Sequence, residues 1–317
     1  MRVAVIGAGN IGSKHLGILA EEPDVEIAAI VSSTLDRARA ATEKWGGNPY
    51  SNCEDLLKHE RIDVAWICVP PYAHGQMELN LIEQGIPFFV EKPLSADLGT
   101  AEKIAATLER TPVISAVGYH WRAMDTLPEV RETLVSNPAR MLLGAWHDTT
   151  PRPEWWRHQA MSGGQVVEQA THLFDLARYL VGEASVTAAT TARYGQAAYP
   201  DADVDDVSAS LLHFYNGATG VFTATCLLGG LAAQYIQIVC EGLLISITQK
   251  GVTYDTVKAH REVTIGNDPF RAEDRAFLEA IRKREESLIL CNYSDALQTH
   301  RLCFSVMAAN YRPDHRR

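Results

Sequence analysis

The stretch GAGNIG, residues 7–12, is the feature that most constrains the fold of this chain. It follows the short apolar run RVAVI and leads into a helical pattern over residues 11–22. A strand, a GxGxxG turn and a helix in this order are typical of a dinucleotide-binding unit. Gly7 would allow the tight turn, Gly9 the approach of a pyrophosphate, and Gly12 the close packing of helix on strand.

The start of this helix is the predicted phosphate site. Backbone N–H groups in the first turn of a helix have no partner within the helix, and the helix dipole adds a partial positive charge. We therefore expect Asn10 and Ile11 to contact the cofactor together with the three glycines. A glycine turn without a ligand is the alternative.

Strand-like and helix-like segments alternate through the first 120 residues, which predicts a doubly wound parallel sheet, an α/β fold. The expected strands are residues 2–8, 25–32, 63–69, 87–91 and 112–120, and the expected helices are 11–22, 35–45, 73–85 and 95–110. We therefore predict a dinucleotide-binding domain over residues 1–120.

The pattern changes after this point, and residues 121–317 are predicted to form a second, α+β domain. A strand over 139–149 and one long helix over 164–182 come first. Strand-like runs separated by turn signals then predict a large, open, mostly antiparallel sheet. These runs are residues 185–195, 205–217, 218–228, 233–242, 243–251 and 252–258, and helices near 272–286 and 293–311 close the chain.

The end of the second strand bears on the choice between NAD and NADP. An Asp or Glu usually binds the free ribose 2′-OH of NAD at this position. Here the chain has Ser32, Ser33 and Thr34, followed by Arg37. Three hydroxyls and a guanidinium suit a 2′-phosphate, so we predict NADP in preference to NAD. Alternatively, the hydroxyls cap the next helix and Arg37 is a solvated helix residue.

Charge and cysteine content limit the other partners. The chain has 29 basic and 39 acidic residues, a formal charge of −10, and no basic stripe, so we expect no nucleic-acid partner. Its longest weakly polar stretch is too short and too broken to span a bilayer. The six cysteines form no CxxC pair, and no leader-like segment precedes the first strand. We therefore expect reduced thiols and a cytoplasmic location. Without an HExxH motif or a cysteine cluster, and with no third ligand evident beside Glu168 and His172, we also expect no metal site.

Four motifs, in this order, carry a resemblance to a known family: GAGNIG, VPPYAH, VEKPLS and GGQVVEQATHLFDLARYL. Together they resemble the glucose–fructose oxidoreductase/inositol dehydrogenase family, often written Gfo/Idh/MocA. The resemblance covers nearly the whole chain. It implies a Rossmann domain, a second domain with a large open sheet, bound NAD(P), and oxidation or reduction of sugars, polyols or related hydroxy and keto compounds. It also implies a homodimer or homotetramer formed through the C-terminal sheet.

The resemblance assigns a role to the EKP stretch at the end of the fourth strand. Lys92 matches the family lysine beside the substrate and the nicotinamide, and Glu91 is expected at the same cofactor end of the sheet. Ligands of open α/β sheets bind outside the carboxyl ends of the strands, where Lys92 lies. Pro93 would limit the directions in which Lys92 can point. The alternative is a surface pair of Glu91 and Lys92.

The resemblance also implies that Pro70, Pro71 and His74 line the nicotinamide side of the cofactor. His74 is equally well interpreted as a first-turn helix residue without a ligand. In the second domain, His172 matches the family histidine that exchanges a proton with the substrate hydroxyl. Glu168 stands where many sugar-oxidising members have Asp, which weakens any transfer of their polyol specificity.

Glu168 and His172 are four residues apart, so one continuous helix would place both on one face. We predict Lys92, His172 and Glu168 as the catalytic set, with a buried core histidine as the alternative for His172.

Five further residues are candidate contacts of the substrate. They are Tyr119, Arg122, Trp155, Trp156 and Arg157. Tryptophan rings can stack on a sugar and guanidinium groups can bind an anion, although tryptophans are more often core or interface residues.

The sequence thus predicts an NAD(P)-dependent oxidoreductase that acts on a small molecule. Two alternatives remain open, an NAD-dependent glycosidase of the same family and a non-catalytic dinucleotide sensor.

Overall fold

The computed structural model describes residues 1–309 and divides into two compact units. The first unit contains Met1–Ala123 and Asp268–Leu297, and the second contains Met124–Asn267 and the chain from Gln298 onward. The late segment joins the first unit because helix α10 (Pro269–Lys283) buries Phe277 and Leu278 in the same core as Val5. A division of the chain at residue 120 alone does not describe this packing.

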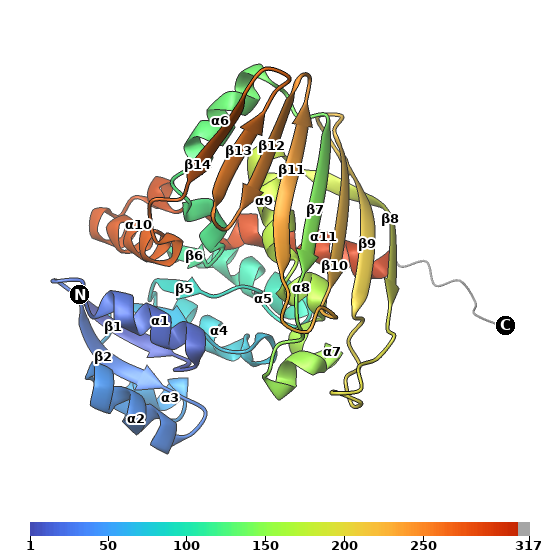
Figure 1. Cartoon of the computed structure of the whole chain (residues 1–317). Helices are drawn as coiled ribbons and strands as arrows, with labels where there is room; N and C mark the ends of the chain where they lie inside the picture. Colours follow the sequence, from blue (N-terminus) through green and yellow to red (C-terminus); the bar gives the residue numbers. More distant parts are fainter. Residues whose placement is uncertain (310–317) are drawn as a thin grey trace. The chain divides into compact units, whose positions relative to one another are not determined.

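The first unit is a six-stranded sheet in the order β3-β2-β1-β4-β5-β6, with every pair parallel (Figure 1). This is the strand order of a Rossmann fold. The strands are β1 Arg2–Ile6, β2 Glu26–Val31, β3 Asn48–Tyr50, β4 Val64–Ile67, β5 Phe88–Val90 and β6 Ser115–Val117. The helices, besides α10, are α1 Asn10–Leu19, α2 Leu35–Trp45, α3 Cys53–His59, α4 Gln76–Glu83 and α5 Leu98–Arg110, with short 3-10 turns η1 Pro71–Ala73, η2 His120–Ala123 and η4 Glu286–Leu288.

Alternate residues of the strands serve two separate cores, one on each face of this sheet. Ala4 and Ile6 of β1 belong to one core, and Val3 and Val5 belong to the other. A parallel sheet with both faces covered by helices requires apolar side chains in both directions. This explains why the strands are continuous apolar runs in the sequence.

The second unit is an eight-stranded sheet in the order β14-β13-β12-β11-β7-β10-β9-β8. All neighbours are antiparallel except β7 and β10, which are parallel. The strands are β7 Met141–His147, β8 Ala184–Ala192, β9 Val207–Phe214, β10 Thr219–Thr225, β11 Ala233–Cys240, β12 Leu243–Thr248, β13 Gly251–Asp255 and β14 His260–Thr264. The helical segments are α6 Leu127–Ser136, η3 Glu154–Arg157, α7 Gln159–Ser162, α8 Gln165–Glu168 and α9 Thr171–Val181. Helix α11 (Tyr293–Ala308) belongs to this unit from Gln298 onward.

The two faces of this larger sheet differ. Helix α9 packs on one face, against β7 and β11 (Figure 1). Side chains alternate along the central strands, and those that point to the other face are partly or fully exposed, as in β9 and β10. Among the described residues no helix covers that other face. The prediction of a large, open, mostly antiparallel sheet is confirmed.

Some local predictions differ from the structure, and helices α3 and α6 were not predicted. The expected helix over 164–182 is two helices, α8 and α9, separated at Gln169 and Ala170. Strands β3 and β14 were not predicted; they are edge strands of three and five residues without a clear alternating pattern. The last two positions of the helix expected over 293–311 lie outside the described residues.

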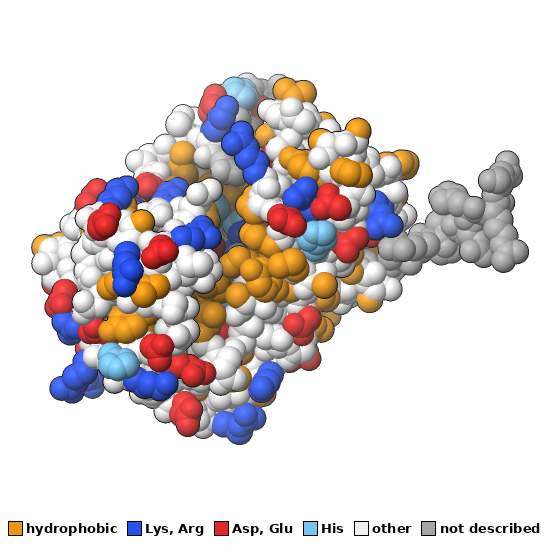
Figure 2. Space-filling model, turned by 90° about the horizontal axis from the view of Figure 1, so that it is seen from below, with side chains coloured by type: hydrophobic (Ala, Val, Ile, Leu, Met, Phe, Trp, Pro, Cys, Tyr) orange, Lys and Arg blue, Asp and Glu red, His pale blue; other side chains and the backbone are white. Residues whose placement is uncertain are grey.

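Figure 2 shows basic and acidic side chains intermixed on the face that it presents, without a basic stripe among the side chains that it colours. Within residues 1–309, every helix is too short or too polar to cross a membrane.

Candidate active site

The glycine loop joins β1 to α1 and has the form that a pyrophosphate site needs. Gly7 has φ 103°, and a Cβ there would lie 2.2 Å from the backbone oxygen of Cys68. A Cβ on Gly12 would lie 1.8 Å from the oxygen of Gly7, so both positions exclude a side chain. By contrast, nothing lies within 4 Å of a Cβ built on Gly9. The loop is therefore closed on the protein side and open where a phosphate would approach.

The first turn of α1 is open to an anion. Gly9 is its N-cap and supplies no side-chain hydrogen bond, and the first turn contains no acidic residue. Asn10 and Ile11 are exposed there, Ile11 to 42%. Unpaired N–H groups and the helix dipole at such an end attract phosphate. The residues present thus fit the phosphates of a dinucleotide.

The four residues after β2 are not equivalent. The Ser32 side chain is buried, and the Thr34 hydroxyl caps α2 by accepting from the backbone N–H of Arg37. Ser33 and Arg37 are exposed, and Nη1 of Arg37 donates to the Ser33 hydroxyl at 3.3 Å. Asp36 is exposed in the same turn and forms an ion pair with Arg39, at 3.6 Å. Only Ser33 and Arg37 remain suited to a 2′-phosphate, with a carboxylate nearby in the chain.

The loop after β4 turns its histidine inward. The side chain of His74 is fully buried, and its Nδ1 lies 2.6 Å from the Glu78 carboxylate, which also accepts from the backbone N–H of Gly75. Pro70 precedes η1, and Pro71 is buried as its first residue. His74 ends η1 and lies before α4. This arrangement favours a structural role for His74.

At the end of β5, Glu91 and Lys92 differ in burial. Glu91 is 6% exposed, and its carboxylate accepts from the backbone N–H of Lys92 and lies 3.0 Å from the Nε2 of His15. Lys92 is partly exposed, and its peptide bond to Pro93 is cis. The interpretation of Glu91 and Lys92 as a surface pair therefore does not hold for Glu91.

An uncharged histidine lies near Lys92 within the same unit. The ring of His120 stacks on that of Phe270, with centroids 4.2 Å apart, and the ammonium of Lys14 lies 3.4 Å from the Phe270 centroid. Burial, with the positive charges of Lys92 and Lys14 adding, lowers the pKa of His120 to about 3. The carboxyl ends of the strands thus carry two ammonium groups and a neutral imidazole.

In the second unit, the interruption of the helix changes the expected relation of Glu168 and His172. The backbone N–H of Ala170 bonds to the oxygen of Gln165, five residues back, so the two side chains belong to separate helices. Their spacing of four residues does not by itself place them on one face. A five-residue step of this kind is a π-type irregularity, a feature often found at functional sites.

Each of these two side chains is held by a tryptophan. Trp156 donates its indole N–H to Oε2 of Glu168 at 2.6 Å. The ring of His172, 4% exposed, stacks on Trp146 of β7 with centroids 5.4 Å apart and planes at 20°. Trp146 was not predicted, because its only signal in the sequence is a place in an apolar strand.

Of the five predicted substrate contacts, three are engaged within the protein. Trp156 is 1% exposed and packs against Val204 and Cys226, which favours a positioning role over a stacking wall. Arg157 pairs with Asp201 at 3.5 Å and lies over the Tyr199 ring. Arg122 is 5% exposed and donates to the backbone oxygen of Leu290 and to Asp295.

Tyr119 and Trp155 complete this set. Tyr119 belongs to a core of the first unit and is 2% exposed. Trp155 is partly exposed, so among the three aromatic candidates its ring is the one that a ligand could reach.

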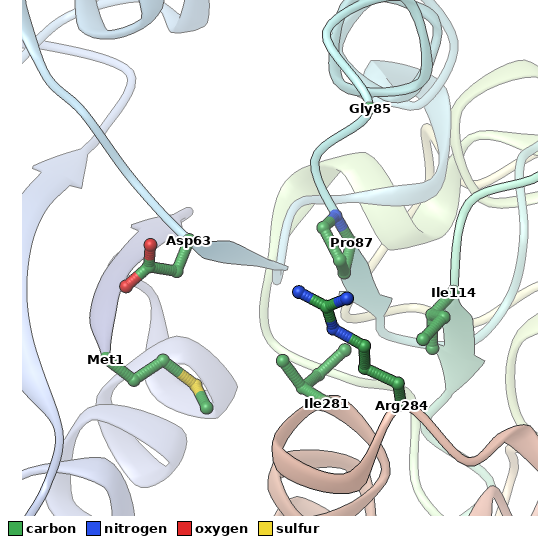
Figure 3. A pocket seen from close by; sticks show the side chains of 7 residues that line it. All are labelled: Met1, Asp63, Gly85, Pro87, Ile114, Ile281 and Arg284. Atoms are coloured by element: carbon green, nitrogen blue, oxygen red, sulfur yellow. The ribbon is translucent and has the colours of Figure 1, made fainter.

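A surface hollow of the first unit lies at the opposite edge of its sheet from Lys92 (Figure 3). Its lining includes Met1, Asp63, Pro87 and Ile114, which precede β1, β4, β5 and β6. These are the amino ends of the strands, whereas ligands of open α/β sheets bind at the carboxyl ends. Arg284 and Asp63 face this hollow with opposite charges, so it has no net preference for an anion.

Comparisons with known proteins agree with this geometry. Residues 1–119 match a sequence model described as an oxidoreductase family with an NAD-binding Rossmann fold, and residues 139–244 match the GFO/IDH/MocA C-terminal domain. The chain is 27% identical over 228 residues to myo-inositol 2-dehydrogenase of Thermotoga maritima, covering 70% of this chain and 67% of that protein.

Solved structures share the fold over the whole chain. The 3-ketoreductase KijD10 of Actinomadura kijaniata, in complex with NADP and TDP-benzene, superposes with a TM-score of 0.85 at 20% identity, covering 99% of both chains. GenD2 from gentamicin A biosynthesis, in complex with NAD, superposes with a TM-score of 0.83 at 20% identity, covering 98% of this chain and 93% of GenD2.

Proposed function

Because the chain belongs to the GFO/IDH/MocA family of NAD(P)-binding oxidoreductases, we propose that it transfers a hydride between a nicotinamide and a sugar, polyol or related hydroxy or keto compound. The observation that carries this proposal is the pairing of an open, uncapped glycine loop with a lysine at the carboxyl end of β5. A non-catalytic dinucleotide sensor would need the loop but not the lysine.

The nicotinamide, when bound, would supply or accept the hydride. The remaining work falls on the protein, which must hold the substrate oxygen and move its proton. In the oxidation direction, the alcohol carbon loses a hydride and the hydroxyl loses a proton, which Lys92 or His172 would accept. In the reduction direction, the same group would return the proton to the carbonyl oxygen. General acid–base groups of this kind contribute about 100- to 10,000-fold in rate.

Glu168 is proposed to orient the substrate or His172. Its carboxylate has a fixed partner in the indole N–H of Trp156, which limits its rotamers. Trp155 is retained as a candidate contact for the substrate. Arg122, Tyr119 and Arg157 are assigned no direct contact with substrate, because their side chains are buried or paired within the protein.

We further propose that NADP is preferred over NAD. The exposed pair of Ser33 and Arg37, beside the N-terminus of α2, supports a 2′-phosphate there. The exposed carboxylate of Asp36 opposes it. Titration of the purified protein with NADPH and NADH, followed by nicotinamide fluorescence, compares the two affinities directly. Tighter binding of NADH would overturn this proposal.

The activity is tested by nicotinamide absorbance with a panel of sugars, polyols and their keto forms. Net formation or loss of reduced cofactor supports the oxidoreductase. Release of a glycoside's leaving group without net change in the cofactor would instead show the NAD-dependent glycosidase. Cofactor binding without any turnover across the panel would favour the sensor.

A homodimer or homotetramer through the second unit's sheet is also proposed. Leu211, Val221 and Leu143 are adjacent on its uncovered face in β9, β10 and β7, and the first two are 36% and 37% exposed. Such a contiguous apolar patch is typical of an interface. Val221→Glu should reduce the mass measured by light scattering, and an unchanged mass would exclude this face.

A cytoplasmic location is proposed on the basis of the cysteines. All six lie within the described residues as free thiols, and five of them are buried. Reduced thiols are usual in the cytosol.

A further inference from the structure

A buried, hydrogen-bonded chain of ionisable side chains ends at the backbone of Lys92. His15 of α1 is at its centre and has no exposed surface. Its Nδ1 lies 2.8 and 2.9 Å from the two carboxylate oxygens of Asp274 in α10, and its Nε2 lies 3.0 Å from Oε1 of Glu91. The other oxygen of Glu91 accepts from the backbone N–H of Lys92 at 3.2 Å. One imidazole thus connects α10 to the backbone of Lys92.

Neighbouring residues bond to this hydrogen-bonded chain or leave room for it. The indole N–H of Trp66 donates to Oδ1 of Asp274 at 2.8 Å. At Gly118, after β6, a Cβ would come within 2.7 Å of the Glu91 carboxylate, so only glycine leaves room for it. Trp66 of β4 thus bonds Asp274, and Gly118 after β6 leaves room for Glu91. Burying so many polar atoms is costly unless each is bonded, which argues for a function.

The two carboxyl partners of His15 favour its charged form. Burial alone would lower the pKa of His15, but the charges and hydrogen bonds of Asp274 and Glu91 raise it well above its ordinary value. Burial, with the charge of Glu91 adding, raises the pKa of Glu273 well above its ordinary value, which favours its neutral form. The imidazole of His15 is thus held in its charged form between the carboxyl groups of Asp274 and Glu91.

A metal ion fits this place poorly. Ligand atoms of His15, Glu91 and Glu273 lie within 4.8 Å of one another. However, both ring nitrogens of His15 already face carboxylates, and a protonated ring cannot be a ligand. The imidazolium therefore occupies the place of a cation.

We propose that the hydrogen-bonded chain His15–Glu91–Asp274 positions Lys92. It would hold the backbone N–H of Lys92 through Glu91, and its charges would set the electrostatic environment of the Lys92 ammonium. The inference rests on the proposed function of Lys92. His15 and Asp274 touch neither substrate nor cofactor in this role and act through Glu91. Because His15 is on the helix that begins at the glycine loop, the same imidazole also ties the phosphate-binding helix to the lysine.

The charges of this hydrogen-bonded chain predict pKa shifts of opposite sign at Lys92 in two variants. Glu91→Gln keeps the shape but removes a negative charge next to Lys92, which should make its ammonium easier to deprotonate. His15→Gln removes a positive charge and should have the opposite effect. The other titratable groups facing this region are Lys14, His120 and Glu273 and the neutral thiol of Cys68, and all of them are unchanged in both variants.

The readout is competitive labelling of lysine amines with acetic anhydride over a range of pH, with mass spectrometry of the peptide that contains Lys92. Relative to wild type, we expect the labelling midpoint to move by about one pH unit, downwards in Glu91→Gln and upwards in His15→Gln. A role in stability alone would not give shifts of opposite sign. Midpoints that stay unchanged, or move in one direction in both variants, would overturn the proposal.

A matched control is Glu22→Gln. Glu22 is another buried carboxylate of the first unit, paired with Arg275 of α10 at 2.7 Å, and it follows the other end of α1. Its removal should leave the Lys92 midpoint unchanged. If His15→Gln does not fold, the direction of the shift in Glu91→Gln decides alone, because an isosteric amide preserves the packing.

Activity provides the second readout. Displacement of a catalytic group by about 1 Å can cost about 100-fold in rate. We therefore expect kcat to fall about 10- to 100-fold in both variants, with the dissociation constant of the cofactor changed less than about threefold. The labelling experiment needs neither substrate nor cofactor, so it tests the positioning chain even if no sugar or polyol is turned over.

Discussion

Glu273→Gln should stabilise the protein, and increasingly so as the pH rises. Glu273 is 5% exposed in α10, and its Oε1 has no hydrogen-bond partner among the described residues. Burial, with the nearby charge of Glu91 adding, raises the pKa of its carboxyl well above the ordinary value in the folded state. The unfolded chain ionises it near the ordinary value of 4.5, so folding must take up a proton. An amide of the same shape avoids that uptake.

The sign and size follow from proton linkage. A group whose pKa is raised on folding contributes stability at low pH that is lost as the pH rises towards the folded-state pKa. Each pH unit in that interval costs the wild type about 1.4 kcal/mol, and the glutamine variant is spared this cost. The difference in unfolding free energy between variant and wild type should be small near pH 4 and then rise at this slope. It should level off where Glu273 ionises in the folded protein.

Urea unfolding of both proteins at a series of pH values measures this difference. Glu279→Gln is the matched control, because Glu279 is on the same helix but partly exposed and paired with Lys283. It should show no benefit that grows with pH. A constant difference for Glu273→Gln, or a loss of stability at every pH, would mean that Glu273 is already ionised when folded, and the raised pKa of Glu273 would then be wrong.

Three further predictions concern the site itself. Lys92→Ala should retain the fold and cofactor binding but lower kcat about 100- to 10,000-fold, and near-normal kcat would remove Lys92 from the mechanism. Trp156→Phe removes the hydrogen bond to Glu168 and should lower kcat about tenfold with unchanged cofactor affinity, because a bond to a charged group is worth about 1.5–3 kcal/mol. Unchanged turnover would show that this bond does not position Glu168. Arg37→Gln should weaken NADPH about tenfold and NADH hardly at all, whereas Asp36→Asn should tighten NADPH; equal effects on both cofactors would contradict a 2′-phosphate contact.

Much of the fold could be predicted because local patterns were strong. The apolar runs of β1, β2 and β4 and the glycine spacing after β1 indicated a doubly wound sheet, and the structure confirms it. The return of α10 to the first unit could not be predicted, since an apolar stripe shows that a helix is buried but not against which sheet. The short edge strands β3 and β14 carry too few residues to show a period.

The surroundings of the candidate residues depended on contacts between distant parts of the chain. His15 falls on the buried stripe of α1 with Gly12, Leu16 and Leu19, and Asp274 falls on that of α10. A polar residue in an apolar stripe was the available signal for both. Their partnership across 259 residues was not available from either pattern.

The interruption between α8 and α9 shows how such distant contacts bear on chemistry. Local period predicted one helix, with Glu168 and His172 related by its pitch. In the structure the pitch is broken, and each side chain instead takes its orientation from a tryptophan elsewhere in the chain, Trp156 and Trp146. If the helix alone set this geometry, replacing either indole would matter little. Because the helix is broken between them, the two tryptophans become part of what determines where the carboxylate and the imidazole point.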